Sequence, residues 1–360
     1  MLAPYSCVMG RLPASLRSCF CTLVVGAGVP PAADSVMRAP LPGARSVALP
    51  AGARPVDTSH PARVVGRGTA TSCTSAAVVA AVRAGGIIRF SCGAKPVTIT
   101  MSETAKVMNT SPQVVLDGGG LVTLSGDGRR RILYMDTCDP AQVWTTSHCQ
   151  DQSSPELVVQ NLAFEDGNST GERFDGGGGG AIFARGGRLR IVNAVFSFNR
   201  CDPNGPDIGG GAIRALSQYD SLPVYVADSR FESNVCSNGG ALSSIGVSWT
   251  VLNSRFLDNR AIGTGANPAQ AGTPGGGSGG AIYNDGDQMT LSVGGSVFLD
   301  NRANEGGGAI FFVSDNRSGT MNISRSTLER NRNAGFHTAG LPGVFFLGAH
   351  SPTITASILR

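Results

Sequence analysis

The sequence predicts an all-β fold, a right-handed parallel β-helix, in which short strands coil into a solenoid with a short N-terminal capping α-helix. Two phrases alternate from residue 179 to residue 331: Gly-Gly-Ala-Ile, once ending in Leu, and an apolar anchor residue followed three positions later by Asn. Repeats of this length that hold only short strands are typical of solenoids, because one coil cannot bury its apolar face alone. Glycine, at 50 of 360 residues, has no Gly-X-Y period, which excludes collagen and indicates tight turns.

The second phrase predicts a buried column along the solenoid. Its copies are Phe196 with Asn199, Phe231 with Asn234, Phe256 with Asn259, Phe298 with Asn301, and Leu328 with Asn331. Residues seven and five positions before each anchor are apolar, which is the period-2 pattern of a strand with one buried face. We expect anchors to stack on anchors and asparagines on asparagines, about 4.8 Å apart. We interpret the asparagines as a structural ladder of internal hydrogen bonds; the alternative is a ligand-binding ladder.

The residues before the repeats predict a helix that covers the N-terminal end of the solenoid. Ser72 or Thr74 can cap a helix over residues 75–84, which Gly85-Gly86 would end. Short strands are expected at residues 87–91, 97–101, 114–116, 121–124 and 132–135, separated by turn residues. A short helix against the first strands would protect the open end of a solenoid.

The cysteines indicate an oxidising compartment. Three of the nine, at positions 7, 19 and 21, precede the fold, and the other six have no C-x-x-C spacing, which favours disulfides over a zinc site. Among the fifteen pairings that six cysteines allow, we predict Cys73 with Cys92, Cys138 with Cys149, and Cys201 with Cys236.

The domain organisation follows from composition. Residues 1–33 combine Arg11 and Arg17 with an apolar run that ends in small residues, which predicts a secretory signal peptide. Residues 34–69 are rich in Pro, Ala and Gly and predict a disordered spacer. The β-helix would span residues 70–360 without a transmembrane segment. Ile354 and Leu359 begin another repeat, so we expect an incomplete solenoid that needs further coils or a partner at this end.

These phrases, together with the block from Ser72 to Gly120, resemble the right-handed parallel β-helix proteins of the pectin-lyase-like superfamily. Within that superfamily they are similar to the repeats of bacterial polymorphic outer membrane proteins and related secreted proteins. The resemblance covers about residues 70–360. It implies a passenger that is secreted or exposed on a bacterial cell envelope and used in adhesion.

A charge pattern accompanies the asparagines. Four basic residues directly follow an asparagine, namely Arg200, Arg260, Arg302 and Arg332, and acidic residues such as Asp258 and Asp300 lie shortly after the anchors. One interpretation is an ion-pair ladder in which each pair contributes under about 1 kcal/mol. The other is a surface strip that binds a polysaccharide, a cell-surface glycan or another partner.

An enzyme is the competing class, because β-helix lyases and glycoside hydrolases degrade polysaccharides with Ca²⁺ sites or paired carboxylates. The candidate carboxylates are Asp117, Asp127, Asp136, Glu165, Asp166 and Asp175. They form no compact motif, so we assign no catalytic residue, no metal site and no cofactor, with Ca²⁺ as the one candidate ion. The net charge of +4 without a basic stripe also argues against nucleic acid.

The sequence thus predicts a secreted or cell-surface β-helix protein with a structural or adhesive role, which binds glycan or a host or neighbouring surface through its solenoid face. The first alternative is a polysaccharide-degrading enzyme on the same fold. A third class, a structural envelope protein without a discrete site, also agrees with the repeats.

Overall fold

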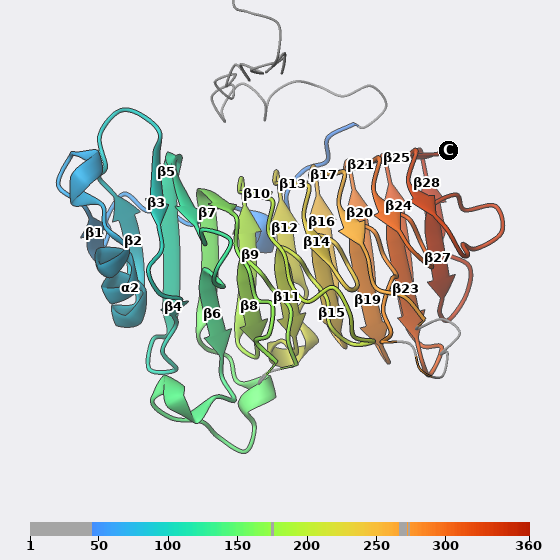
Figure 1. Cartoon of the computed structure of the whole chain (residues 1–360), viewed down its shortest axis with the longest axis horizontal. Coiled ribbons are helices and arrows are strands. Elements are labelled where there is room, and N and C mark those ends of the chain that lie inside the picture. The colour runs from blue at the N-terminus through green and yellow to red at the C-terminus, as the bar shows by residue number, and fades with distance from the viewer. Residues whose placement is uncertain (1–44, 174–175, 266–271, 273) are drawn as a thin grey trace, which may run out of the picture.

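The computed structural model describes residues 45–173, 176–265, 272 and 274–360, and these form a parallel β-helix (Figure 1). Its strands belong to a 17-stranded, an 8-stranded and a 4-stranded sheet, whose strands pair in parallel. Within these described residues, the α-helix α2 (Ser75–Ala84) lies at the N-terminal end. The predicted all-β solenoid with a capping helix is therefore confirmed.

The helix forms where its caps predict it. The Thr74 side chain accepts a hydrogen bond from the Ala77 N–H, and Gly85 ends the helix with a φ of 70°. The helix lies against β1 (Arg63–Val65), β2 (Gly86–Phe90) and β4 (Ala105–Lys106). Val78 and Val82 on its inner face are fully buried, so the helix closes one end of the core.

The first coils are less regular than the repeats, and two of their strands, β5 (Gln113–Ser125) and β7 (Glu156–Glu165), are longer. They also contain β3 (Val97–Thr100) and β6 (Leu133–Asp136). The two strands expected at residues 114–116 and 121–124 form one strand, β5, because the residues between them are accommodated as a register shift between Asp117 and Val122 against β7.

The repeats build two series of strands in the largest sheet. The first series is β9 (Arg188–Val192), β12 (Val224–Ala227), β16 (Trp249–Leu252), β20 (Thr290–Gly294), β24 (Thr320–Ser324) and β28 (Thr353–Thr355). The second is β10 (Val195–Ser197), β13 (Arg230–Glu232), β17 (Arg255–Leu257), β21 (Val297–Leu299), β25 (Thr327–Glu329) and β29 (Ile358–Leu359). The anchors lie in the second series and are in register from coil to coil.

The other two sheets complete each coil. The four short strands after the asparagines are β14 (Val235–Cys236), β18 (Arg260–Ala261), β22 (Arg302–Ala303) and β26 (Arg332–Asn333). The strands after the glycine pairs are β8 (Ile182–Arg185), β11 (Ile213–Leu216), β15 (Leu242–Ile245), β19 (Ile282–Gly286) and β23 (Ile310–Ser314), and β27 (Val344–Leu347), after the single Gly343, continues their sheet. Short 3₁₀ turns lie at residues 51–53, 70–72, 140–142, 149–151 and 219–221.

The anchor rings form one continuous stack in the core. Ring centroids of successive phenylalanines from Phe164 to Phe298 are 5.0, 4.9, 4.8 and 4.5 Å apart, and the rings are within 5° of parallel. All of them are fully buried, as is Leu328 at the next level. The alternating apolar positions therefore face inward, and the residues that separate them remain available to the surface.

Left-handed backbone makes the bends between strands. Asn253, three residues before an anchor, has a φ of 51°, and Asp258, two residues after it, has a φ of 49°. Asn and Asp adopt this conformation at lower cost than most residues. Gly307 has a φ of 62°, and a Cβ there would clash with the Ile310 carbonyl oxygen, so the first glycine of the pair is required for the bend.

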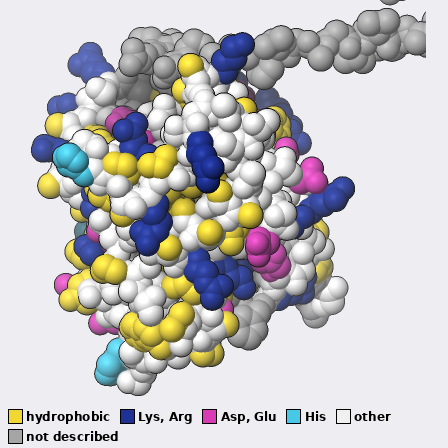
Figure 2. Space-filling view, turned by 90° about the vertical axis from the view of Figure 1, so that its left-hand side faces the viewer, with side chains coloured by type: hydrophobic (Ala, Val, Ile, Leu, Met, Phe, Trp, Pro, Cys, Tyr) yellow, Lys and Arg dark blue, Asp and Glu magenta, His cyan; other side chains and the backbone are white. Residues whose placement is uncertain are grey.

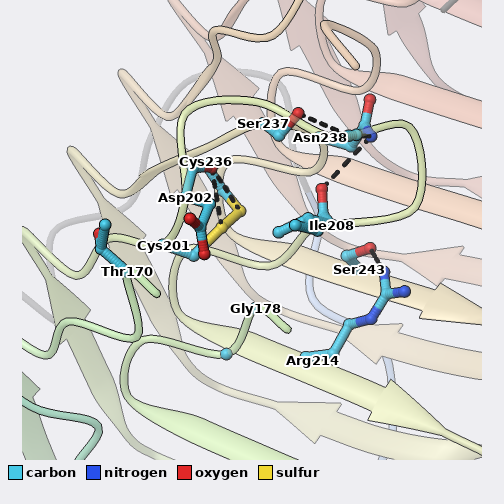
Figure 3. Close-up of a disulfide and its surroundings, with 12 residues drawn as sticks. Thr170, Gly178, Cys201, Asp202, Ile208, Arg214, Cys236, Ser237, Asn238 and Ser243 are labelled. Atoms are coloured by element: carbon cyan, nitrogen blue, oxygen red, sulfur yellow. Dashed lines mark hydrogen bonds between the residues drawn. A yellow bond between two sulfur atoms is a disulfide. The ribbon is translucent and has the colours of Figure 1, made fainter. Parts of the chain in front are cut away.

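Three disulfides join Cys73 to Cys92, Cys138 to Cys149, and Cys201 to Cys236, the pairs expected from the sequence. The first links the segment before α2 to the residues after β2. The third joins a loop residue, Cys201, to Cys236 of β14 on the next coil, beside Asp202 (Figure 3). Disulfides of this kind are typical of proteins in oxidising compartments.

The expectation of a disordered spacer at residues 34–69 is wrong for residues 45–69. Residues 45–58, here called the strap, run along the outside of the solenoid, from Arg45, whose N–H donates to the Arg325 carbonyl, to Thr58 beside Asp117 (Figure 1). Its apolar residues pack with Tyr225, Ala227 and Leu252 in a separate small cluster. The strap lacks an apolar period because its partners are distant solenoid side chains. The predicted signal peptide, residues 1–33, lies outside the described residues.

The strands of the last repeat, β28 and β29, pair with the preceding coil in the expected register. Ile354 pairs with Ile323 and Leu359 with Leu328, the positions that the alignment assigns to them. Both side chains are partly buried against the core.

Candidate binding surface

The side-chain amides of the asparagine ladder bond to one another and to the backbone. Asn259 Nδ2 donates to Asn301 Oδ1 at 2.9 Å and to the Phe231 carbonyl at 3.0 Å. Its Oδ1 accepts from both the backbone N–H and the Nδ2 of Asn234, at 3.1 and 2.9 Å. The residue is fully buried. An amide with every donor and acceptor engaged inside the core has nothing to offer a ligand, so the geometry supports a structural ladder.

A second ladder was not anticipated from the sequence. Five serines two positions before the anchors each accept a hydrogen bond from the backbone N–H one coil earlier, at 3.1–3.2 Å: Ser229, Ser254, Ser296, Ser326 and Ser357. The recurrence of serine at this position was the signal that could have predicted it. Both corners of the large sheet are therefore held by side-chain ladders.

The structure brings together three of the four predicted arginines. Arg260, Arg302 and Arg332 are the first residues of β18, β22 and β26 and lie in register on neighbouring coils. We call these three residues the arginine strip; all are exposed. Arg200 is separated from them because Val235 occupies the intervening position, and its guanidinium instead donates to the Gly128 carbonyl at 2.9 Å.

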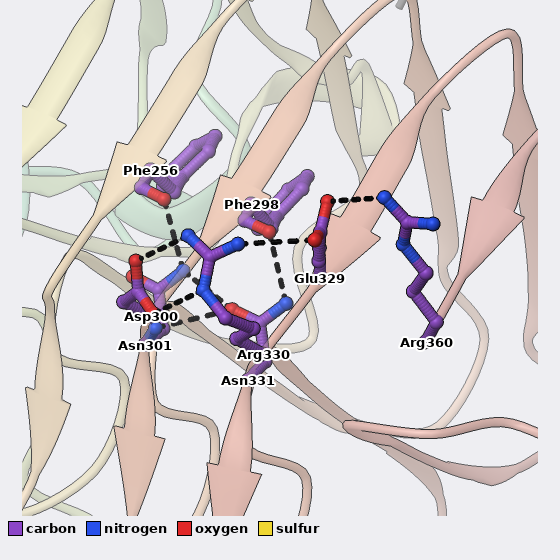
Figure 4. A network of polar contacts seen from close by, with 8 residues as sticks. All are labelled: Phe256, Phe298, Asp300, Asn301, Glu329, Arg330, Asn331 and Arg360. Atoms are coloured by element: carbon purple, nitrogen blue, oxygen red, sulfur yellow. Dashed lines mark hydrogen bonds and ion pairs between the residues drawn. The ribbon is translucent and has the colours of Figure 1, made fainter. Parts of the chain in front are cut away.

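The acidic residues engage only part of this charge. Asp258 pairs with Arg260 of its own coil at 3.1 Å. Asp300 does not pair with Arg302; it accepts two hydrogen bonds from Arg330 of the next coil, both at 2.8 Å (Figure 4). Arg330 also contacts Glu329, and Glu329 contacts Arg360, which extends an ion-pair network between coils. Arg330 replaces the aspartate found at the same position of the two preceding coils, which is why it was missed.

Two residues of the arginine strip, Arg302 and Arg332, keep a positive charge that no ion pair with a described residue neutralises. Hydrogen bonds from Arg330 lower the pKa of Asp300, and the nearby Arg302 and Arg332 act in the same direction. Within the described residues, Arg302 and Arg332 form no ion pair of their own. Two exposed guanidiniums on adjacent coils repel each other, and an anion between them would remove that repulsion through charge-assisted hydrogen bonds.

One candidate carboxylate, Asp117, lies beside a pocket. Burial acts to raise the pKa of Asp117, but hydrogen bonds from Thr58, Asn161, Gly119 and Gln160 outweigh it, so the pKa lies below its ordinary value. Asp117 is the one acidic residue among the described residues that line a shallow pocket of about 420 Å³. This carboxylate is therefore held in structural contacts.

Of the remaining candidates, Glu165 and Asp166 are neighbours, and the others lie apart from them. Asp127 pairs with Arg129 on the surface at 3.2 Å, and Asp136 accepts from the Cys138 N–H at 2.8 Å. Burial, followed by the charge of Asp166, raises the pKa of Glu165. Asp175 lies outside the described residues. Within the part of the chain that the structure describes, no three His, Cys, Asp or Glu side chains gather as a metal site would require.

Comparison with known proteins adds one match. Residues 295–313 match the family profile described as the Chlamydia polymorphic membrane protein repeat. This stretch contains Phe298, Asn301 and the glycine pair at Gly307-Gly308, and so includes one copy of both phrases. No curated protein and no solved structure matches the chain significantly.

Across the described ranges, none of the helices has the length and apolar character needed to cross a membrane.

Proposed function

We propose that this protein is a surface-exposed β-helix of a bacterial cell envelope, without catalytic activity, that contributes to adhesion by binding anionic glycans. The repeat match supports an outer-surface location, because the matching family is a membrane protein family of a bacterium. The three disulfides support an oxidising, extracytoplasmic environment.

The observation that carries the binding proposal is the register of Arg302 with Arg332 on adjacent coils, both exposed and both without an ion pair to a described residue. Arginine presents a planar fork of donors that matches carboxylate and sulfate oxygens. A linear polysaccharide that carries such groups could contact successive coils along the arginine strip, so binding would depend on both residues.

The experiment compares wild type with the Arg302→Gln, Arg332→Gln double variant for binding to immobilised chondroitin sulfate and alginate, with neutral dextran as the reference polymer. We expect the double variant to lose about tenfold or more in affinity, since hydrogen bonds to charged groups contribute about 1.5–3 kcal/mol each. Arg67→Gln with Arg83→Gln is the matched control, because it removes the same charge far from the strip. Equal affinity of the strip variant and wild type, or equal binding to dextran, would reject the proposal.

The polysaccharide-degrading alternative has less support, because Asp117 is held by hydrogen bonds and Asp127 is engaged in an ion pair. Incubation with pectin, alginate and chondroitin, with and without Ca²⁺, tests it directly: release of unsaturated products or new reducing ends would favour the enzyme.

A further inference from the structure

The N-terminal end of the solenoid carries charge of almost one sign. Residues 59–106, which form α2, the first strands and their loops, contain six basic residues and one acidic residue, Glu103. The basic residues are Arg63, Arg67, Arg83, Arg89, Lys95 and Lys106. The whole chain is nearly balanced, with 29 Lys and Arg against 25 Asp and Glu, so this segment holds a local excess.

The fold gathers these residues at one end. β1 pairs with β2 as the first strands of the large sheet, β4 is the last strand in the order of the 8-stranded sheet, and α2 packs against all three. Figure 2 looks onto this end and shows Lys and Arg side chains spread across it, with hydrophobic side chains between them and few acidic ones.

Most of the charge is not engaged. Arg63 donates to the Gly85 carbonyl at 2.8 Å, and Lys106 lies 5.7 Å from the centroid of the Tyr134 ring. The side chains of four residues have no hydrogen bond or ion pair with any described residue: Arg67, Arg83, Arg89 and Lys95. All four residues are exposed. We call these four residues and Val64 the basic end.

The apolar residues at this end favour a lipid surface over nucleic acid as the anionic partner. Val64 is 54 % exposed, and it lies in register with Arg89 on the same short edge of the sheet. Ala76, Ala80 and Ala84 of α2 are exposed. Aliphatic groups among cations suit the boundary of lipid headgroups and acyl chains, whereas single-stranded nucleic acid is bound by exposed aromatic platforms. The aromatic residue of this segment, Phe90, packs against the core instead.

We propose that the basic end docks against a membrane surface of anionic phospholipids. Lipid phosphates would bind the four unengaged cations while Val64 and the alanines of α2 enter the headgroup layer. The solenoid would then stand end-on, and its later coils, including the arginine strip, would project away from the membrane. This proposal does not depend on glycan binding, because it uses a different surface.

The test measures binding of the full chain to vesicles that contain phosphatidylglycerol, by sedimentation, with phosphatidylcholine vesicles as the reference. The Arg67→Gln, Arg83→Gln, Lys95→Gln triple variant should bind about a hundredfold more weakly, since each basic residue near an anionic surface contributes about a fivefold factor. Wild-type binding should also weaken as salt is raised. Arg129→Gln, Arg317→Gln, Arg325→Gln is the matched control, because these exposed residues lie outside both the basic end and the arginine strip, and it should bind like wild type.

Hydrogen exchange with bound vesicles supplies a second readout that does not depend on a variant's folding. Residues 63–84 should gain protection, and β24 to β27 should not. The proposal is overturned if the triple variant binds like wild type, if both vesicle types bind equally, or if protection falls on the later coils. Two further results together would overturn it: soluble polyphosphate competes fully with the vesicles, and the Val64→Ser variant binds vesicles like wild type. The basic end would then be a general polyanion site.

Discussion

Asn253 and Val47, 206 residues apart in sequence, pair as two strands of a sheet would. The Val47 N–H donates to Asn253 Oδ1 at 2.8 Å, and Asn253 Nδ2 donates to the Val47 carbonyl at 3.0 Å. Gln160 holds Val56 in the same way, with distances of 2.8 and 3.0 Å. Two side-chain amides therefore fasten the strap to the solenoid by its backbone.

Replacing Asn253 with Ala should loosen the strap. The change removes both hydrogen bonds to Val47, which together contribute about 1–3 kcal/mol, and limited proteolysis should cut within residues 45–58 faster than in wild type. Asn193→Ala is the matched control, because Asn193 occupies the same left-handed corner with a φ of 48° but bonds Asn161 instead of the strap. If both variants are cut at the wild-type rate, the strap is not held by this amide.

Replacing Phe256 with Ala should destabilise the core by about 3–5 kcal/mol, because the ring is fully buried between two stacked neighbours and its removal leaves a cavity. Chemical denaturation measures the change. Phe198→Ala provides the comparison, since Phe198 is 60 % exposed and its loss should change stability little. An unchanged unfolding midpoint for Phe256→Ala would contradict the stacked core.

Stability should depend on pH through Asp300. Arg330 lowers the pKa of Asp300 in the folded state below its unfolded value of about 3.9. The contribution of the pair is therefore fully present above that unfolded pKa and is lost as pH falls through the folded pKa. The difference in unfolding midpoint between wild type and Asp300→Asn should be small, because the pair is exposed, and it should shrink further below about pH 4. A difference that grows on acidification would contradict this pairing.

Removing the first disulfide should affect one end of the molecule. Cys73 and Cys92 are 19 residues apart, and closing a loop of that size stabilises a fold by about 3 kcal/mol. In Cys73→Ser, Cys92→Ser, hydrogen exchange should accelerate in α2 and β1 and stay unchanged in β21 to β25, since the coils between them are held by their own ladders. Uniform acceleration along the chain would show that the end does not open separately.

Several features could be predicted from residue patterns because they arise between neighbouring coils. Phe256 stacks on Phe298 and Asn259 bonds Asn301 since equivalent positions of successive repeats must meet at about 4.8 Å. The strip of Arg260, Arg302 and Arg332 follows from the same register. Its ion pairs did not follow, because the direction of a long side chain at a left-handed corner decides whether Asp300 meets Arg302 or Arg330.

The strap shows the limit of such reasoning. Its composition is that of a spacer, and nothing within residues 45–58 indicates that Val47 will meet Asn253 or that Thr58 will meet Asp117. The repeating phrases, acting over one coil, were sufficient to determine the solenoid, its buried column and its asparagine ladder. Only the assembled coils decided where the strap lies, which charges remain unpaired and which end is basic, because those properties depend on groups that are distant in sequence and become neighbours on a finished surface.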